Sequence, residues 1–326
     1  MRSLQAAEEH WQLASRFAIS RGAKTQATVV VAQVGDGRYR GRGECAPYPR
    51  YGESARSVLA QINAARAEIE AGADRRSLQS LLKPGAARNA LDCALWDLEA
   101  KQSGVRAYEL AGRVRPDPVK TAYTISLDEP SAMADAARVA SGRPMLKLKL
   151  GGGPDLERVQ AVRRAAPKTR LIVDANEAWG FDELQRLAPQ LAALGVKLIE
   201  QPLPAAEDRA LEGYRSPVPL CADESLHTRA ELAACAGRYA CVNIKLDKAG
   251  GLTEALALAA DARSRELMIM AGSMVATSLS VAPALILAQG ADFVDLDGPL
   301  LLACDRDPGL RILGSMIEPA SPELWG

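Results

Sequence analysis

The stretch MLKLKL at residues 145–150 is the first of five short apolar runs that carry a charged residue near their ends. The others are RLIVDAN (170–176), VKLIEQP (196–202), PLCADES (219–225) and VNIKLDK (242–248). The charged residues are 25, 26, 23 and 22 positions apart, and in chain order they are Lys149, Asp174, Glu200, Asp223 and Lys245. Each interval has room for one strand, one amphipathic helix and two tight loops, which is typical of a parallel β/α unit.

Three more runs extend the series to eight: VKTAYTISL (119–127), LMIMAGSM (267–274) and FVDLDGP (293–299). Eight strands with seven intervening helices predict an α/β fold, a (β/α)7β TIM-like barrel. A doubly wound open sheet is the alternative, but the near-constant period favours closure. Active sites of such barrels lie at the carboxyl ends of the strands, so we expect the five charged residues to surround one mouth.

Three of these residues, Asp174, Glu200 and Asp223, are carboxylates at equivalent places in successive repeats. Oxygen ligands without nitrogen or sulfur suit a hard divalent cation, so we expect one Mg²⁺ per subunit, with Mn²⁺ as the next choice. Any one of them alone could be a helix N-cap. Three around one mouth would repel one another without a cation.

The two lysines of the series, Lys149 and Lys245, fall on the second and sixth expected strands and should face each other across the mouth. Lys147 shares a strand face with Lys149 and can lower its pKa by its charge. Two opposed lysines beside a cation indicate proton transfer at carbon, in which one removes an α-proton and the other protonates the opposite face of an enediolate. Lys248 is interpreted as a solvated loop residue.

The N-terminal third lacks this regular repeat and instead mixes strand and helix signals. It predicts an α+β capping domain over residues 1–115. ATVVVAQV (27–34) and the residues after it read as a hairpin, with GDGRYRGRG (35–43) as its turn, and helices are expected near 54–71, 75–83 and 87–103. The barrel is expected to span 116–298. The remaining segment, 299–326, is expected to return to the cap.

The composition excludes several classes of function. Forty basic and forty acidic residues give zero net charge, which argues against nucleic acid or a membrane as partner. Two histidines rule out HExxH and other zinc sites built on several histidines, and no GxSxG motif is present. The six cysteines form no CxxC pair, and the first residues lack the apolar core of a signal peptide, so we expect a cytoplasmic protein.

Taken together, several motifs of this chain resemble the enolase superfamily, in its muconate-lactonizing subgroup. The motifs are ALDCALWDLEAKQSG, KLKL, VDANEAW, IEQPL, ADES, NIKLDKAGG and AGSM, which cover nearly the whole chain. A lysine base acting with magnesium is general for this superfamily. Within the subgroup, GECAPYPRYGES (43–54) and DLD (295–297) look like the dipeptide epimerases, most of all those acting on L-Ala-D/L-Glu.

The resemblance implies an isomerase that inverts the α-carbon of the C-terminal residue of a dipeptide and serves in murein peptide recycling. It implies that Asp295 and Asp297 bind the substrate ammonium, and that Arg21 binds its acidic side chain, with Arg50 as a second candidate. Thr124 and Ser273 complete the expected substrate-binding residues. A homo-oligomer is possible.

Three rival functions remain open on the sequence alone. The same site could racemise N-acylamino acids, or carry out the dehydration of an o-succinylbenzoate synthase. Lys245 could form a Schiff base in an aldolase. The barrel could also be a non-catalytic scaffold, although a scaffold does not need two opposed lysines around three carboxylates.

Overall fold

Eight parallel strands lie side by side in one sheet of the computed structural model, which describes residues 2–326. Their order follows the chain: β5 (Tyr123–Ile125), β6 (Met145–Lys149), β7 (Arg170–Asp174), β8 (Val196–Glu200), β9 (Leu220–Ala222), β10 (Cys241–Lys245), β11 (Met268–Gly272) and β12 (Phe293–Asp295). The two ends of the sheet meet where Ala122 N donates to Val294 O at 2.8 Å. Leu296 N donates to Thr121 Oγ1 at 2.8 Å in the same place. The predicted barrel is confirmed, as a nearly closed one.

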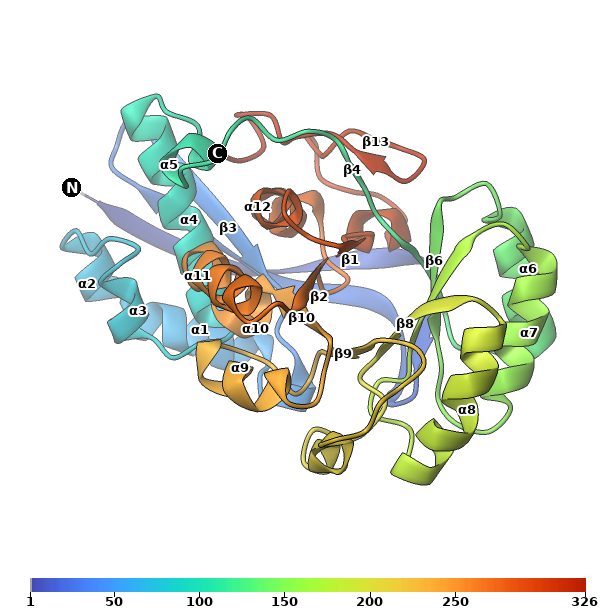
Figure 1. Ribbon diagram of the computed structural model, residues 1–326. Helices are drawn as coiled ribbons and strands as arrows, with labels where there is room; N and C mark the ends of the chain where they lie inside the picture. The colour runs from blue at the N-terminus through green and yellow to red at the C-terminus, as the bar shows by residue number, and fades with distance from the viewer. Residues whose placement is uncertain (1) are drawn as a thin grey trace.

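Helices connect successive strands on the outside of the barrel (Figure 1). They are α6 (Pro130–Val139), α7 (Asp155–Ala165), α8 (Phe181–Ala193), α9 (Arg229–Ala236), the short α10 (Leu246–Ala249), α11 (Leu252–Ser264) and α12 (Ser278–Ala288). Between β8 and β9 the structure has only a 3-10 turn, η2 (Asp208–Leu211). The expectation of a full helix in every interval is therefore wrong there, where prolines at 202, 204, 217 and 219 leave only residues 205–216 for a helix.

The barrel interior has an apolar floor and a charged mouth. Alternate residues of each strand point inward, so Met145, Lys147 and Lys149 of β6 lie at successive levels. The floor consists of Ala122, Met145, Ile172, Leu198, Cys221, Cys241, Met270 and Phe293. At the mouth, Lys149 pairs in register with Asp174, and Asp174 with Glu200. The strand register thus sets the charged residues at one level.

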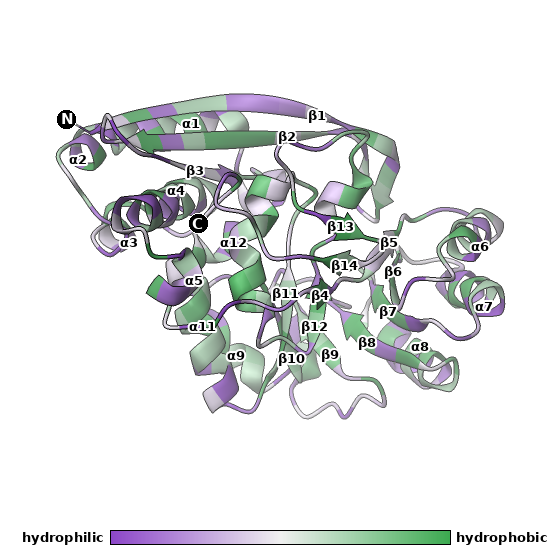
Figure 2. Cartoon of the chain, turned by 90° about the horizontal axis from the view of Figure 1, so that it is seen from above, coloured by the Kyte–Doolittle hydropathy of each residue, from purple (hydrophilic) through white to green (hydrophobic). Residues whose placement is uncertain are grey.

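The cap is built on an antiparallel sheet of β1 (Ser3–Ile19), β2 (Gly22–Gly35) and β3 (Arg40–Cys45), with α1 (Ala55–Ala64), α2 (Arg66–Glu70), α3 (Leu78–Leu81), α4 (Ala86–Ser103) and α5 (Ala107–Leu110) beside it. Figure 2 shows that β2 is apolar along most of its length, whereas β1 carries a hydrophilic stretch. The sequence interpretation missed β1, because an exposed edge strand need not alternate clearly.

Helix α4 packs unusually close to β3. A Cβ atom at Gly41 would lie 2.1 Å from Ala94 O, and one at Gly43 would lie 2.2 Å from Ala90 O. Only glycine permits this approach of strand to helix backbone. The contact holds the strand that leads into the loop 46–53, which runs through η1 (Pro49–Tyr51) and covers the barrel mouth.

The C-terminal segment runs from η3 (Gly298–Leu301) through β13 (Ile312–Leu313) and β14 (Met316–Ile317). β14 pairs with β4 (Val119–Lys120), so the first residues of the run 119–127 lie in this small sheet and not in the barrel. The segment also touches the cap: Ala303 N donates to Gln12 O at 2.8 Å, and Trp325 Nε1 to Cys93 O at 3.0 Å. Within residues 2–326, no helix is both long and apolar enough to cross a membrane.

Candidate active site

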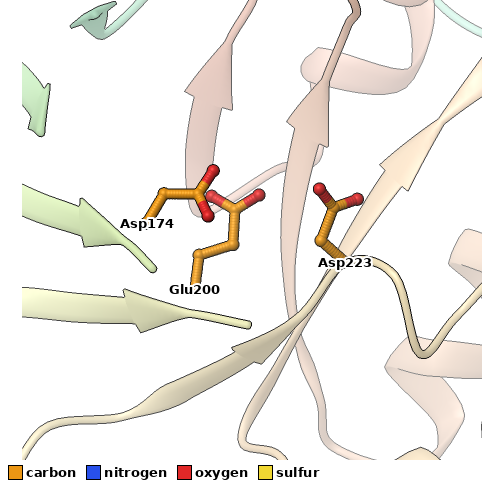
Figure 3. A group of neighbouring side chains, drawn as sticks. All are labelled: Asp174, Glu200 and Asp223. Atoms are coloured by element: carbon orange, nitrogen blue, oxygen red, sulfur yellow. The ribbon is translucent and has the colours of Figure 1, made fainter. Parts of the chain in front are cut away.

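Three buried carboxylates converge at the barrel mouth. Asp174 ends β7, Glu200 ends β8, and Asp223 directly follows β9. One oxygen from each lies within 4.8 Å of the others. Figure 3 shows the three side chains directed toward a common space. The structure thus brings together the three residues predicted as metal ligands.

The chemistry of this triad fits a hard cation. Its donors are oxygens only, which is the ligand set that Mg²⁺, Mn²⁺ and Ca²⁺ prefer. All three carboxylates are buried, and they lie close enough together to repel one another when ionised. Buried charges of one sign are costly unless positive charges balance them. The triad could therefore hold a metal ion.

Lys147 lies beneath the triad and is wholly buried. Its Nζ lies 2.6 Å from Asp295 Oδ2, 2.7 Å from Glu200 Oε2 and 3.1 Å from Asp174 Oδ2. Burial opposes the charged form, but these carboxylates outweigh it and hold the pKa of Lys147 well above its usual value. Lys147 is a permanent positive charge below the site.

The charges around the triad give Glu200 and Asp174 very different pKa values. Burial and the charge of Asp174 raise the pKa of Glu200 to about 7. Burial also acts to raise the pKa of Asp174, but Lys149 and Lys147 outweigh it and lower that pKa to about 2. A cation that enters the triad replaces the proton that Glu200 otherwise binds near neutral pH.

Lys149 and Lys245 stand on opposite sides of the mouth, because β6 and β10 are the second and sixth of eight strands. Lys149 Nζ donates to Asp174 Oδ2 at 2.6 Å, and Lys245 Nζ to Asp223 Oδ2 at 2.7 Å. Both line an open cavity of about 690 Å³ between barrel and cap, and Ser273 is part of its wall. A molecule in this cavity would have a lysine on each side.

The two aspartates of DLD are buried near Lys147 and do not line this cavity. Asp295 is held by Lys147, and its Oδ1 has no partner among residues 2–326. Asp297 Oδ2 accepts a hydrogen bond from the backbone N of Thr124 at 2.6 Å. Burial and the charge of Asp295 raise the pKa of Asp297 to about 6. Thr124 and Asp297 are thus neighbours, while Asp295 belongs to the network around Lys147.

The two arginines predicted to meet a substrate carboxylate already have carboxylate partners. Arg21, in the β1–β2 turn, lies 2.6 Å from Glu224 and 3.0 Å from Glu177. Arg50 makes two bonds of 2.8 Å to Glu177. Both line the cavity, and both tie the cap to the loops after β7 and β9.

Sequence reasoning missed Lys24, which lies on the same wall three residues after Arg21. Its side chain is exposed to solvent in the open cavity, and the cavity walls partly desolvate it. This desolvation, with the charge of Lys149, lowers the pKa of Lys24 to about 8. Within residues 2–326 no carboxylate contributes to that pKa. A lysine three residues after Arg21, just before the predicted strand 27–34, was a signal that could have drawn attention to it.

The interpretation of Lys248 as a solvated loop residue is wrong. Its side chain is buried and contacts Asp223. The loop after β10 folds at once into α10, which turns Lys248 back beneath the mouth.

Family models match both parts of the chain. Residues 1–112 match the N-terminal domain of mandelate racemase / muconate lactonizing enzyme, and residues 131–297 match the enolase C-terminal domain-like model. The L-Ala-D/L-Glu epimerase of Escherichia coli (strain K12) is 48% identical over 95% of this chain and 98% of its own. The N-acetyl-D-glutamate racemase of a Pseudoalteromonas species is 44% identical over 91% of this chain and 95% of its own.

Solved structures agree with this. An enolase family member from Agrobacterium tumefaciens, with homology to dipeptide epimerases and with bound sodium and L-Ala-L-Glu, has a TM-score of 0.98 and 53% identity, over 100% of both chains. A dipeptide epimerase from Enterococcus faecalis V583, complexed with Mg and L-Leu-L-Tyr, has a TM-score of 0.90 and 26% identity, over 98% of this chain and 97% of that one. By fold, charged mouth and likeness over its whole length, the chain belongs to the enolase superfamily, among its dipeptide epimerases.

Proposed function

We propose that this isomerase inverts the α-carbon of the C-terminal residue of a dipeptide, with L-Ala-D/L-Glu as the preferred substrate. The observation that carries the proposal is the pair Lys149 and Lys245, set on opposite sides of one carboxylate triad at the wall of one cavity. The relatives that act on or bind L-Ala-Glu support the choice of substrate.

The two lysines move the proton. One lysine in its neutral form takes the α-proton from one face, and the other, as an ammonium, gives a proton to the opposite face. The roles exchange in the reverse direction, so the product has the inverted configuration. Lys147 keeps a positive charge near the reacting centre, where negative charge develops on deprotonation.

Asp174, Glu200 and Asp223 would hold one Mg²⁺, or Mn²⁺, which when bound would bind the terminal carboxylate of the substrate and stabilise the negative charge that develops on deprotonation. Magnesium with a dipeptide in one relative supports this choice.

The ammonium and the acidic side chain of the dipeptide must each meet a protein group of opposite charge. Asp295 and Asp297 lie behind the cavity wall, and we assign the ammonium to Asp297 by likeness to the dipeptide epimerases, because Asp295 is already paired with Lys147. Thr124 holds the Asp297 carboxylate through its backbone N, and Ser273 offers a hydroxyl on the cavity wall. For the acidic side chain we assign Lys24, with Arg21 beside it. The charges of Arg21 and Arg50 are balanced by Glu177 and Glu224, whereas the charge of Lys24 is not.

The second candidate is racemisation of an N-acylated acidic amino acid. One observation favours it: a relative at 44% identity is an N-acetyl-D-glutamate racemase. Such a substrate keeps the acidic side chain but has no ammonium, so Asp297 would have no partner on it.

The test is incubation in deuterated water with Mg²⁺ of L-Ala-L-Glu or of N-acetyl-L-glutamate, followed by proton NMR. We expect the dipeptide to lose its α-proton signal and yield L-Ala-D-Glu, with the acetylated compound at least about tenfold slower, because one charge-assisted hydrogen bond is lost. Equal rates would favour the racemase. Full activity in excess chelator would contradict the metal assignment.

The cellular role we propose is murein peptide recycling in the cytoplasm, by likeness to the epimerase relatives. All six cysteines being free thiols supports a reducing compartment. Cells that lack this protein should accumulate L-Ala-D-Glu. Size-exclusion chromatography would show whether the chain forms a homo-oligomer.

A further inference from the structure

One short segment, β10 with the first turn of α10, touches two carboxylates of the triad from behind. It carries Lys245 on the cavity wall and, on either side of it, the buried polar residues Asn243 and Lys248. Neither of these two lines the large cavity between barrel and cap. Their contacts are with the triad.

Lys248 uses its ammonium to hold Asp223. The Nζ atom lies 2.6 Å from Asp223 Oδ1 and 3.0 Å from the backbone O of Asn243, and it also donates to the backbone O of Asp223. These three acceptors match the three donors of a lysine ammonium. Asp223 is thereby held at one carboxylate oxygen and at its backbone carbonyl.

Asn243 holds Glu200 in a similar way. Its Nδ2 donates to Glu200 Oε1 at 2.7 Å. The neighbouring strand leaves room for this amide, since a Cβ atom at Gly272 would lie 2.3 Å from Asn243 Oδ1. The other oxygen of Glu200, Oε2, lies 2.7 Å from Lys147 Nζ.

Each of the two carboxylates therefore has one oxygen held from behind, by Lys248 or Asn243, and its other oxygen faces a lysine of the mouth. Asp223 Oδ2 lies 2.7 Å from Lys245 Nζ, and Glu200 Oε2 lies 2.7 Å from Lys147 Nζ. Because one oxygen is tied to Asn243 or Lys248, each carboxylate can meet a cation only through the oxygen that now faces a lysine. Mg²⁺ requires near-octahedral geometry with short bonds, whereas Ca²⁺ accepts six to eight oxygens and often takes carboxylates through both.

We propose that Lys248 and Asn243 are positioning residues that restrict Asp223 and Glu200 to one oxygen each and so make the triad select Mg²⁺ over Ca²⁺. The inference rests on the cation site of the proposed function, but not on the identity of the dipeptide.

The test measures the ratio of the dissociation constants for Ca²⁺ and Mg²⁺ by titration calorimetry without substrate. A ratio is the right readout, because loss of the Lys248 charge acts on two divalent cations alike and cancels. A variant that merely loosens the barrel would also weaken both. For Asn243→Ala and Lys248→Met we expect the preference for Mg²⁺ to fall about tenfold or more, the scale on which such supporting contacts affect metal sites.

Lys197→Met is the matched control, because Lys197 lies on β8 with Glu200 but is exposed. Its ratio should equal that of the unaltered protein. Circular dichroism melts show whether each variant folds. Asn243→Ala changes no charge, so it keeps the proposal testable if Lys248→Met does not fold.

An unchanged ratio in a folded Asn243→Ala or Lys248→Met variant would overturn the inference while the function stands. Parallel deuterium exchange on L-Ala-L-Glu keeps the two apart. An unaltered protein that exchanges the dipeptide proton but prefers Ca²⁺ would likewise refute the inference alone. If the unaltered protein bound no divalent cation, the inference and the metal assignment would both fail.

Discussion

Replacing Lys24 by Met should remove the preference of the enzyme for an acidic second residue. The side chain lies on the wall of the cavity that also holds Lys149 and Lys245, and no carboxylate of the described chain contributes to its pKa. We expect kcat/KM for L-Ala-L-Glu to fall, while kcat/KM for the uncharged L-Ala-L-Gln stays nearly constant.

The magnitude follows from the position of the side chain. A hydrogen bond to a charged group contributes about 1.5–3 kcal/mol. Because the cavity is open to solvent, screening places Lys24 at the lower end, about 1.5 kcal/mol, which is about tenfold in kcat/KM.

The pKa adds a second signature. Since the pKa of Lys24 is lowered to about 8, its positive charge is present below that pH and is lost as the pH rises through it. About nine-tenths of the side chain is protonated at pH 7 and about one-tenth at pH 9. The ratio of kcat/KM for Ala-Glu to that for Ala-Gln should therefore fall between these pH values. The titration of the catalytic lysines affects both substrates and cancels in the ratio.

Lys24→Arg is the control, since arginine stays charged over this range and should keep the preference without the pH dependence. The assay is polarimetry or chiral chromatography with both dipeptides at each pH. The reasoning is refuted if the ratio is flat in the unaltered enzyme and Lys24→Met leaves it unchanged.

Three further predictions concern the mouth of the barrel. Lys245→Ala should abolish epimerisation in both directions but allow deuterium exchange from one epimer through Lys149, as NMR in deuterated water would show. If variants of Lys149 and of Lys245 both still epimerised the dipeptide, the two-base mechanism would be contradicted. Glu200→Gln should abolish cation binding in calorimetry and turnover with it, while the melting temperature changes little, because the residue lies at the barrel mouth. Asp297→Asn should lower kcat/KM for L-Ala-L-Glu at least about tenfold and affect N-acetyl-L-glutamate far less; equal losses in steady-state assays would remove Asp297 from ammonium binding.

The barrel could be predicted because its strands are buried on both faces and so read as apolar runs at a regular period. The charged residues at the mouth, such as Glu200, interrupted that pattern and were visible for this reason. Strand β1 had no such signal, since it lies at an exposed edge with charged residues along it.

Contacts between distant parts of the chain could not be predicted in the same way. The partners of Arg21 are Glu177 and Glu224, more than 150 positions later, and no local pattern reveals that they neutralise its charge. The burial of Lys248 depends on how sharply the chain turns after β10, which the letters LDK do not specify.

The turn between β1 and β2 separates substrate choice from chemistry. Arg21 fastens this turn to barrel loops, and Lys24 projects from the start of β2, yet neither residue belongs to the barrel that carries the lysine pair. Residues 22–24 can thus be exchanged as a cassette. A library that varies positions 22–24 and retains Arg21 would sample new dipeptide preferences on an unaltered proton-transfer apparatus. The same separation gives evolution a route by which one barrel can serve peptides of different composition through changes in a single hairpin.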